Sequence, residues 1–188
     1  ATAMESFNLA IIVMALNSLT LTLALGLFLL VLWLNPKRQP NIYYALLLLM
    51  VSLWTVGTLL GHAVALVSGP SPIVGFGVRL LQVGFVGASV SAYLFTAAMV
   101  GSRGRIFAGL SIAGLLMVLA YQAVLLLGQV SVPYTIDDGY LSYSNSALNV
   151  LVFVLFDGAT LMLIGLQRRR INERGVLAGL LLFLVGQL

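Results

Sequence analysis

The sequence contains no cysteine, a single histidine and few charged residues of either sign. The absence of cysteine excludes disulfide bonds, thiolate metal sites and thiol nucleophiles. With His62 as the only histidine, a bis-histidine haem or a multi-histidine metal site cannot form within this chain. Charged residues make up 7% of the 188 residues, against about 25% in soluble domains. The sequence therefore does not predict a soluble catalytic domain.

Apolar residues, in contrast, make up 61% of the chain. A stretch of about 20 apolar residues suffices to cross a bilayer core of about 30 Å. The apolar runs are separated by short polar links with prolines, glycines or arginines, which are typical of helix ends. We therefore expect an all-α, polytopic transmembrane helical bundle that forms one domain. Its expected spans cover about 7–34, 42–67, 73–100, 106–127, 147–166 and 176–188.

The sixth segment is shorter than the others, with 13 residues from Val176 to Leu188. At about 1.5 Å per residue it reaches about 20 Å, which is less than a bilayer core. We expect this span to be incomplete and the sequence to be a piece of a longer protein.

Eight of the nine cations lie in alternate links between the predicted spans. They are Lys37, Arg38, Arg103, Arg105, Arg168, Arg169, Arg170 and Arg174. The intervening links carry no cation, and the link over 129–146 holds Asp137 and Asp138. By the positive-inside rule, we expect the basic links in the cytoplasm of a bacterium, the chain in the inner membrane, and the N-terminus outside. Topology thus explains the net charge of +4, and we expect lipid rather than nucleic acid as a partner.

Small residues recur at helical spacing in the second and third spans. Gly57 and Gly61 lie four residues apart, and Gly84, Ala88 and Ala92 form one stripe. Helices in lipid approach each other closely where such residues meet. We expect these two spans to pack tightly, either within the chain or as the interface of a homodimer.

The polar link over 129–146 has the pattern of a short β-hairpin. Val132, Tyr134 and Ile136 alternate with other residues, and Asp137-Asp138-Gly139 can turn the chain. This hairpin would cover the bundle, meet a partner, or lie on the membrane surface with its tyrosines at the lipid headgroups.

Six polar residues fall in the outer half or near the middle of the predicted spans. They are Asn17, His62, Arg79, Gln82, Gln122 and Asp157. An ionisable group in a span costs roughly 2.5–3.5 kcal/mol and usually faces a cavity or a partner. Counting about 1.5 Å per residue from the outer ends of their spans places Arg79 about 9 Å deep and Asp157 about 15 Å deep. The long arginine side chain can close this difference, so we predict an ion pair between the two or, alternatively, that Arg79 extends to the outer interface. The six residues either line a polar pocket open to the outside, as a ligand site would, or form structural hydrogen bonds between helices.

Catalytic motifs are absent from the sequence. Gly75-Phe76-Gly77 lacks the third glycine of a dinucleotide loop, and no nucleophile lies beside a base. We expect no enzymatic activity, metal or cofactor. His62 could ligate the magnesium of a pigment, but an interhelical hydrogen bond is the favoured role.

Three segments carry a resemblance to a known family: Asn35-Pro36-Lys37-Arg38, the run from Tyr43 to Trp54, and the basic link Gly101-Ser102-Arg103-Gly104-Arg105. Together with the order of the spans, they resemble the N-terminal sensor region of bacterial histidine kinases with seven spans. The resemblance implies a signal-receiving module whose kinase activity would reside beyond Leu188. The alternative is an accessory subunit of a photosynthetic or respiratory membrane complex, and a third option is a small transporter.

Overall fold

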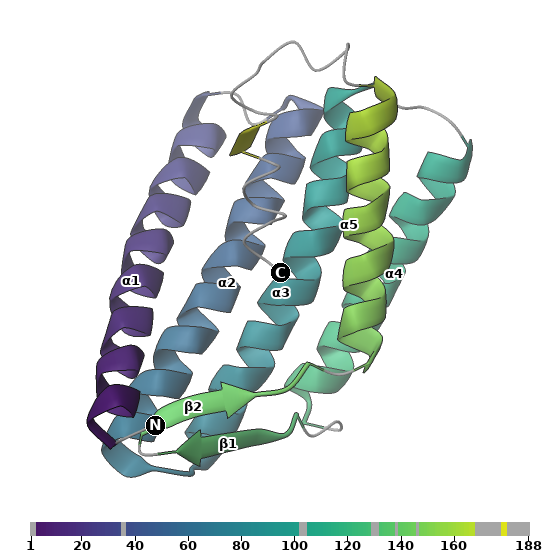
Figure 1. Ribbon diagram of the computed structural model, residues 1–188. Helices are drawn as coiled ribbons and strands as arrows, with labels where there is room; N and C mark the ends of the chain where they lie inside the picture. Colours follow the sequence, from purple (N-terminus) through teal and green to yellow (C-terminus); the bar gives the residue numbers. More distant parts are fainter. Residues whose placement is uncertain are drawn as a thin grey trace.

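The structure is a computed structural model that describes residues 3–34, 37–101, 105–128, 132–137, 139–145, 147–167 and 178–179. Within these ranges the chain forms five long helices and one two-stranded hairpin (Figure 1). The helices are α1 (Ala3–Leu34), α2 (Gln39–Ser68), α3 (Pro72–Met99), α4 (Arg105–Leu126) and α5 (Ala147–Gln167). The strands are β1 (Tyr134–Asp137) and β2 (Tyr140–Tyr143). All five helices are long and apolar enough to cross a membrane, as expected for a helical, multi-pass membrane protein.

The five helices lie where the first five spans were predicted. The largest difference is at the start of α1, which begins at Ala3 rather than near Phe7. The predicted sixth span over 176–188 lies outside the described residues except for 178–179.

The turn between α2 and α3 shows how local chemistry sets the helix ends. Gly69 follows α2 with a φ of 66°, a left-handed conformation that glycine adopts without strain, and its N–H donates to the carbonyl of Ala65. Two residues later the Ser71 hydroxyl accepts a hydrogen bond from the N–H of Val74 and caps α3. The chain therefore reverses within a few residues, and α2 and α3 become antiparallel neighbours.

The helix α3 is the centre of the bundle and α1 lies at its edge (Figure 1). Residues are buried at 72% of the positions in the most apolar part of α3, against 6% in α1. The reason is that α3 packs against α2, α4 and α5, whereas α1 packs on α2 and touches β2. Most of α1 would therefore face lipid in a membrane.

Glycines bring the backbones of α2 and α3 into direct contact. A Cβ atom added to Gly57 would lie 2.8 Å from the Cα of Leu81, and one added to Gly84 would lie 2.6 Å from the Cα of Trp54. The prediction of tight packing between these spans is confirmed. The contact lies within one chain, so these glycines do not supply the surface of a homodimer.

The predicted hairpin forms and covers one end of the bundle (Figure 1). Tyr134 pairs with Tyr143 and Asp137 pairs with Tyr140, while Gly139 takes a φ of 83° in the turn. Leu141 is 1% exposed, in a cluster with Val74 and Val78 of α3. The hairpin thus covers this end of the bundle, as one of the predicted placements has it. We call this end of the bundle the hairpin end.

The helices α3 and α5 differ in length and begin at different levels at the hairpin end. At about 1.5 Å per residue, α3 is about 42 Å long and α5 about 32 Å, so α5 is closer to the thickness of a bilayer core. Gln82, the eleventh residue of α3, contacts Asn149, the third residue of α5. The helix α5 therefore begins about 12 Å beyond the start of α3.

Candidate functional site

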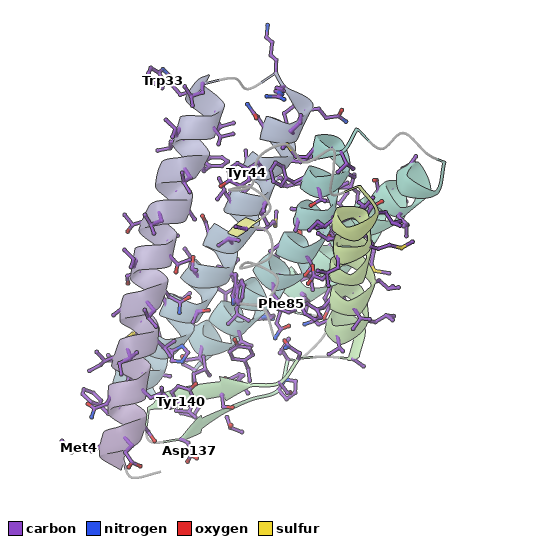
Figure 2. All side chains as sticks on the ribbon, turned by 45° about the horizontal axis from the view of Figure 1, so that its top comes forward. Met4, Trp33, Tyr44, Phe85, Asp137 and Tyr140 are labelled. Carbon is purple, nitrogen blue, oxygen red and sulfur yellow. The ribbon has the colours of Figure 1, made fainter. Side chains whose placement is uncertain are left out.

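The six polar residues predicted within spans do not gather in one pocket. The structure distributes them among α1, the hairpin end of α2, the contacts of α3 with α4 and α5, and the end of α4. Figure 2 labels two reference points for these positions, Tyr140 at the hairpin end and Phe85 in the middle of the bundle. Gln82 and Gln122 form hydrogen bonds between helices, as the second alternative predicted, whereas Asn17 and His62 bond within their own helices, so that part of the prediction is wrong.

The side chain of Asn17 forms its hydrogen bond within its own helix, α1. Its amide donates to the carbonyl of Val13 at 2.8 Å. Such a bond to the preceding turn provides the partner that a polar group needs in lipid.

His62 lies under the hairpin and is 2% exposed. Its Nδ1 is 3.0 Å from the carbonyl oxygen of Thr58, which can only accept, so Nδ1 carries the proton. The neutral ring then has a lone pair on Nε2, which is buried and has no hydrogen-bond partner. The ring of Tyr140 stands edge-on to the imidazole at 5.5 Å. The hairpin thus lies directly against the imidazole ring of His62.

Gln82 is the centre of a group of amides that joins three parts of the chain. Its Nε2 donates to Oδ1 of Asn145 at 3.1 Å, and Nδ2 of Asn149 donates to its Oε1. Gln82 and Asn149 are buried, whereas Asn145, between β2 and α5, is exposed. We call these three residues the amide cluster. It binds the start of α5 and the end of the hairpin to α3.

Gln122 links α4 to α3 at nearly the same level. Its Nε2 donates to the carbonyl of Val83 at 3.1 Å, and it lies against Gly87, where an added Cβ would be 3.1 Å from this nitrogen. The glycine therefore makes room for the amide.

Asp157 does not pair with Arg79, and the predicted ion pair is wrong. The hydroxyl of Ser89 donates to Oδ2 of Asp157 at 3.3 Å. Arg79 precedes Ser89 by ten residues on the same helix, which is about 15 Å along its axis. The prediction failed because it counted depth from helix ends assumed to be level, whereas α5 starts well beyond the start of α3.

Arg79 lies instead beside the end of α4. A Cβ added to Gly128 would lie 2.5 Å from one terminal nitrogen of the guanidinium. The last carbonyls of a helix carry partial negative charge, so a cation is favourable there. This position agrees better with the alternative in which Arg79 extends to the interface.

Aromatic rings fill the space next to the amide cluster. Trp54 meets Phe85 edge-on at 5.5 Å, and Phe85 stacks on Phe153 at 5.8 Å. Burial, and to a lesser degree the neighbouring Tyr140, raise the pKa of Tyr143 on β2, while a hydrogen bond with Trp54 lowers it. Tyr143 thus joins the hairpin to Trp54 of α2.

The cations predicted to set the topology are described only in part. Lys37 and Arg38 are exposed between α1 and α2, and Arg105 is the first residue of α4. All three are at the end of the bundle opposite the hairpin. Arg103, Arg168, Arg169, Arg170 and Arg174 lie outside the described residues.

Three residues of these contacts were not singled out from the sequence: Ser89, Asn145 and Asn149. Ser89 follows Gln82 by seven residues, which is two helical turns, so the two share a face of α3. That spacing was a usable signal. Asn145 gave none, because it lies in a link whose path is set by the hairpin.

The part of the chain that the structure describes contains no group of three or more His, Asp or Glu side chains arranged to hold a metal. Comparisons of the chain with protein-family models, curated proteins and solved structures gave no match. The resemblance to the sensor region of histidine kinases therefore stays a prediction.

Proposed function

We propose that the chain is a signal-receiving membrane module without catalytic activity of its own, in which the hairpin receives the signal and α5 transmits it. The observation that carries this proposal is the continuity of the hairpin with α5. The strand β2 is anchored by Leu141, and Asn145, two residues after β2, joins the amide cluster. A displacement of the hairpin therefore acts on the first turn of α5.

The charges favour an orientation with the hairpin and the N-terminus outside a bacterial inner membrane. Lys37 and Arg38 are exposed at the opposite end, and cations near spans favour the cytoplasm. The chain has no cysteine, so single cysteines can report the topology. Ser142→Cys should react with an impermeant maleimide from outside, and Gln167→Cys should not. The reverse pattern would contradict this orientation.

The resemblance to seven-span histidine kinases fits the same direction of signalling. In that family a cytoplasmic signalling module follows the last span. In the proposed orientation α5 ends at Gln167 on the cytoplasmic side, opposite the hairpin.

The coupling between hairpin and α5 can be measured as a distance at the far end of the bundle. Spin labels at Gln39→Cys and Leu166→Cys, both exposed, report the separation of α2 and α5 there. Replacing Leu141 with Asn should release the hairpin, because an amide is costly in an apolar cluster. In nanodiscs we expect the distance distribution to shift or broaden. Thr135→Asn, exposed on β1, is the matched control and should leave it unchanged.

An unchanged distance in Leu141→Asn, with retained helical circular dichroism, would contradict transmission through α5. That result would favour the accessory subunit, whose helices need not move. Should Leu141→Asn not fold, the milder Leu141→Ala removes part of the same anchor, and the same comparison applies.

A further inference from the structure

Asp157 places a carboxyl group in the middle of a membrane-spanning helix. It is the eleventh residue of the 21 in α5, so each end of the helix lies about 15 Å away. Its side chain is 4% exposed. A charged side chain at this depth is costly unless something compensates the charge.

Only one side of this carboxyl group has a hydrogen-bond donor. Oδ2 accepts from the hydroxyl of Ser89, which is itself fully buried and 3.5 Å from the carbonyl oxygen of Phe85. Oδ1 is buried and has no hydrogen-bond partner. The group therefore presents an unpartnered oxygen inside the bundle.

Among the helix residues whose side chains the structure describes, no cation is placed to balance Asp157. Arg79 is about 15 Å away along α3, and Arg105 begins α4 at the end of the bundle. The other titratable side chains on α2, α3 and α4 belong to four tyrosines and one histidine. They are Tyr93 on α3, Tyr121 on α4, and Tyr43, Tyr44 and His62 on α2.

The surroundings of Asp157 restrict what can supply the positive charge. Tyr93 bonds to Ser111 and meets the ring of Phe156, and Thr160 donates to the carbonyl of Phe156. These side chains are therefore engaged away from the carboxyl group. What remains is a set of oxygen atoms, from Asp157 and Ser89, with one negative charge. Oxygen ligands suit hard cations, and one carboxylate balances one positive charge.

We propose that Asp157 and Ser89 form a binding site within the membrane for a monovalent cation, which enters as H⁺ or as Na⁺. H⁺ forms a bond to Oδ1, and Na⁺ shares the carboxylate and hydroxyl oxygens. Occupancy of the site stabilises the contact between α3 and α5. The inference does not rest on the signalling role proposed above.

Thermal unfolding of the chain in phosphatidylcholine nanodiscs tests the site. A cation that binds only the folded state raises Tm, and a tenfold increase in its concentration above the dissociation constant should add about 3–5 °C. We expect Tm of the wild type to rise with Na⁺ against choline at equal ionic strength, or with falling pH between about pH 9 and about pH 5. Asp157→Asn, which keeps the shape but not the charge, should lose this response. Asp137→Asn, an exposed carboxyl on β1, should keep it.

The two cations are separated by labelling with dicyclohexylcarbodiimide, an apolar reagent that reacts with protonated carboxyl groups. Mass spectrometry should find the adduct on Asp157. Slower labelling in Na⁺ than in choline at fixed pH identifies Na⁺ as the cation. If a rise in pH slows the labelling of Asp157 and Na⁺ has no effect, the cation is H⁺.

The proposal is overturned when Tm of the wild type and of Asp157→Asn respond equally to both cations, or when neither responds. Should Asp157→Asn not fold, Ser89→Ala replaces it. This variant keeps the carboxyl group but loses one ligand oxygen and the hydroxyl that donates to the charged carboxylate, so its response should move to higher Na⁺ or to higher pH. An unmoved response in Ser89→Ala would contradict the site as well.

Discussion

The two main contacts of α3 are built in different ways. Against α2, glycines let backbone meet backbone at Gly57 and Gly84. Against α5, side chains meet through hydrogen bonds at Gln82 and Ser89 and through the stacked ring of Phe85. Backbone contacts fix position and angle with little tolerance, whereas side chains adjust by changing rotamer. The pair of α2 and α3 is therefore the rigid part of the bundle, and α5 is the part that can shift.

The largest effect is expected where a methyl group enters the contact between α2 and α3. In Gly84→Ala the new Cβ would lie 2.6 Å from the Cα of Trp54 and 2.7 Å from the carbonyl oxygen of Met50. These are backbone atoms, so the helices must separate. Overpacking of this kind costs about 1–3 kcal/mol or more. We expect the free energy of unfolding, measured by denaturant titration in mixed micelles, to fall by that amount.

Glycines outside this contact provide controls of opposite sign. Nothing lies within 4 Å of a Cβ added to Gly26 or Gly158, so alanine should stabilise these helices by up to about 1 kcal/mol. Gly61→Ala is intermediate, because its Cβ meets only the flexible end of Leu141. Equal effects at Gly84 and Gly158 would show that the backbone contact is not what holds α2 and α3 together.

A smaller effect is expected in the contact between α3 and α5. Gln82→Leu removes the partner of Asn149, and Asn149→Leu removes that of Gln82. Interhelical hydrogen bonds in membranes contribute about 0.6 kcal/mol on average and up to about 1.7 kcal/mol. The double mutant should therefore be more stable than the sum of the single effects predicts, by about 1 kcal/mol. Strict additivity would mean that the amides do not couple the two helices.

The rigid contact could be predicted from the sequence, and much of the side-chain contact could not. Gly57 and Gly84 stand out because small residues at helical spacing have one physical use in lipid, the close approach of two backbones. Helix positions followed equally well from apolar runs bounded by residues such as Pro40 and Gly69, which set backbone geometry locally. Both the glycine contacts and the helix ends are set by residues close together in the sequence, so a local pattern is enough to predict them.

The partner of a polar side chain depends on the register between helices, which no local pattern specifies. Asp157 was assigned to Arg79 by counting from ends assumed to be level, and the offset of about 12 Å between α3 and α5 gave it Ser89 instead. This offset arises because α3 continues beyond the start of α5 to support the hairpin. The alternating residues around Tyr134 and Ile136 did predict the hairpin, but not its effect on register.

The smallest effect concerns pH and separates the hairpin from the rigid contact. Burial raises the pKa of Tyr143 above its usual value of 10.0. The folded protein thus holds this proton more tightly than the unfolded chain, so the contribution of Tyr143 to stability is complete below about pH 10 and is lost as pH rises through the folded pKa. The difference in tyrosinate absorbance between the wild type and Tyr143→Phe should titrate with a midpoint above 10.0. A midpoint at or below this value would place the phenol in water. The hairpin would then lie away from Trp54, and its packing on the rigid pair of α2 and α3 would be looser than the structure shows.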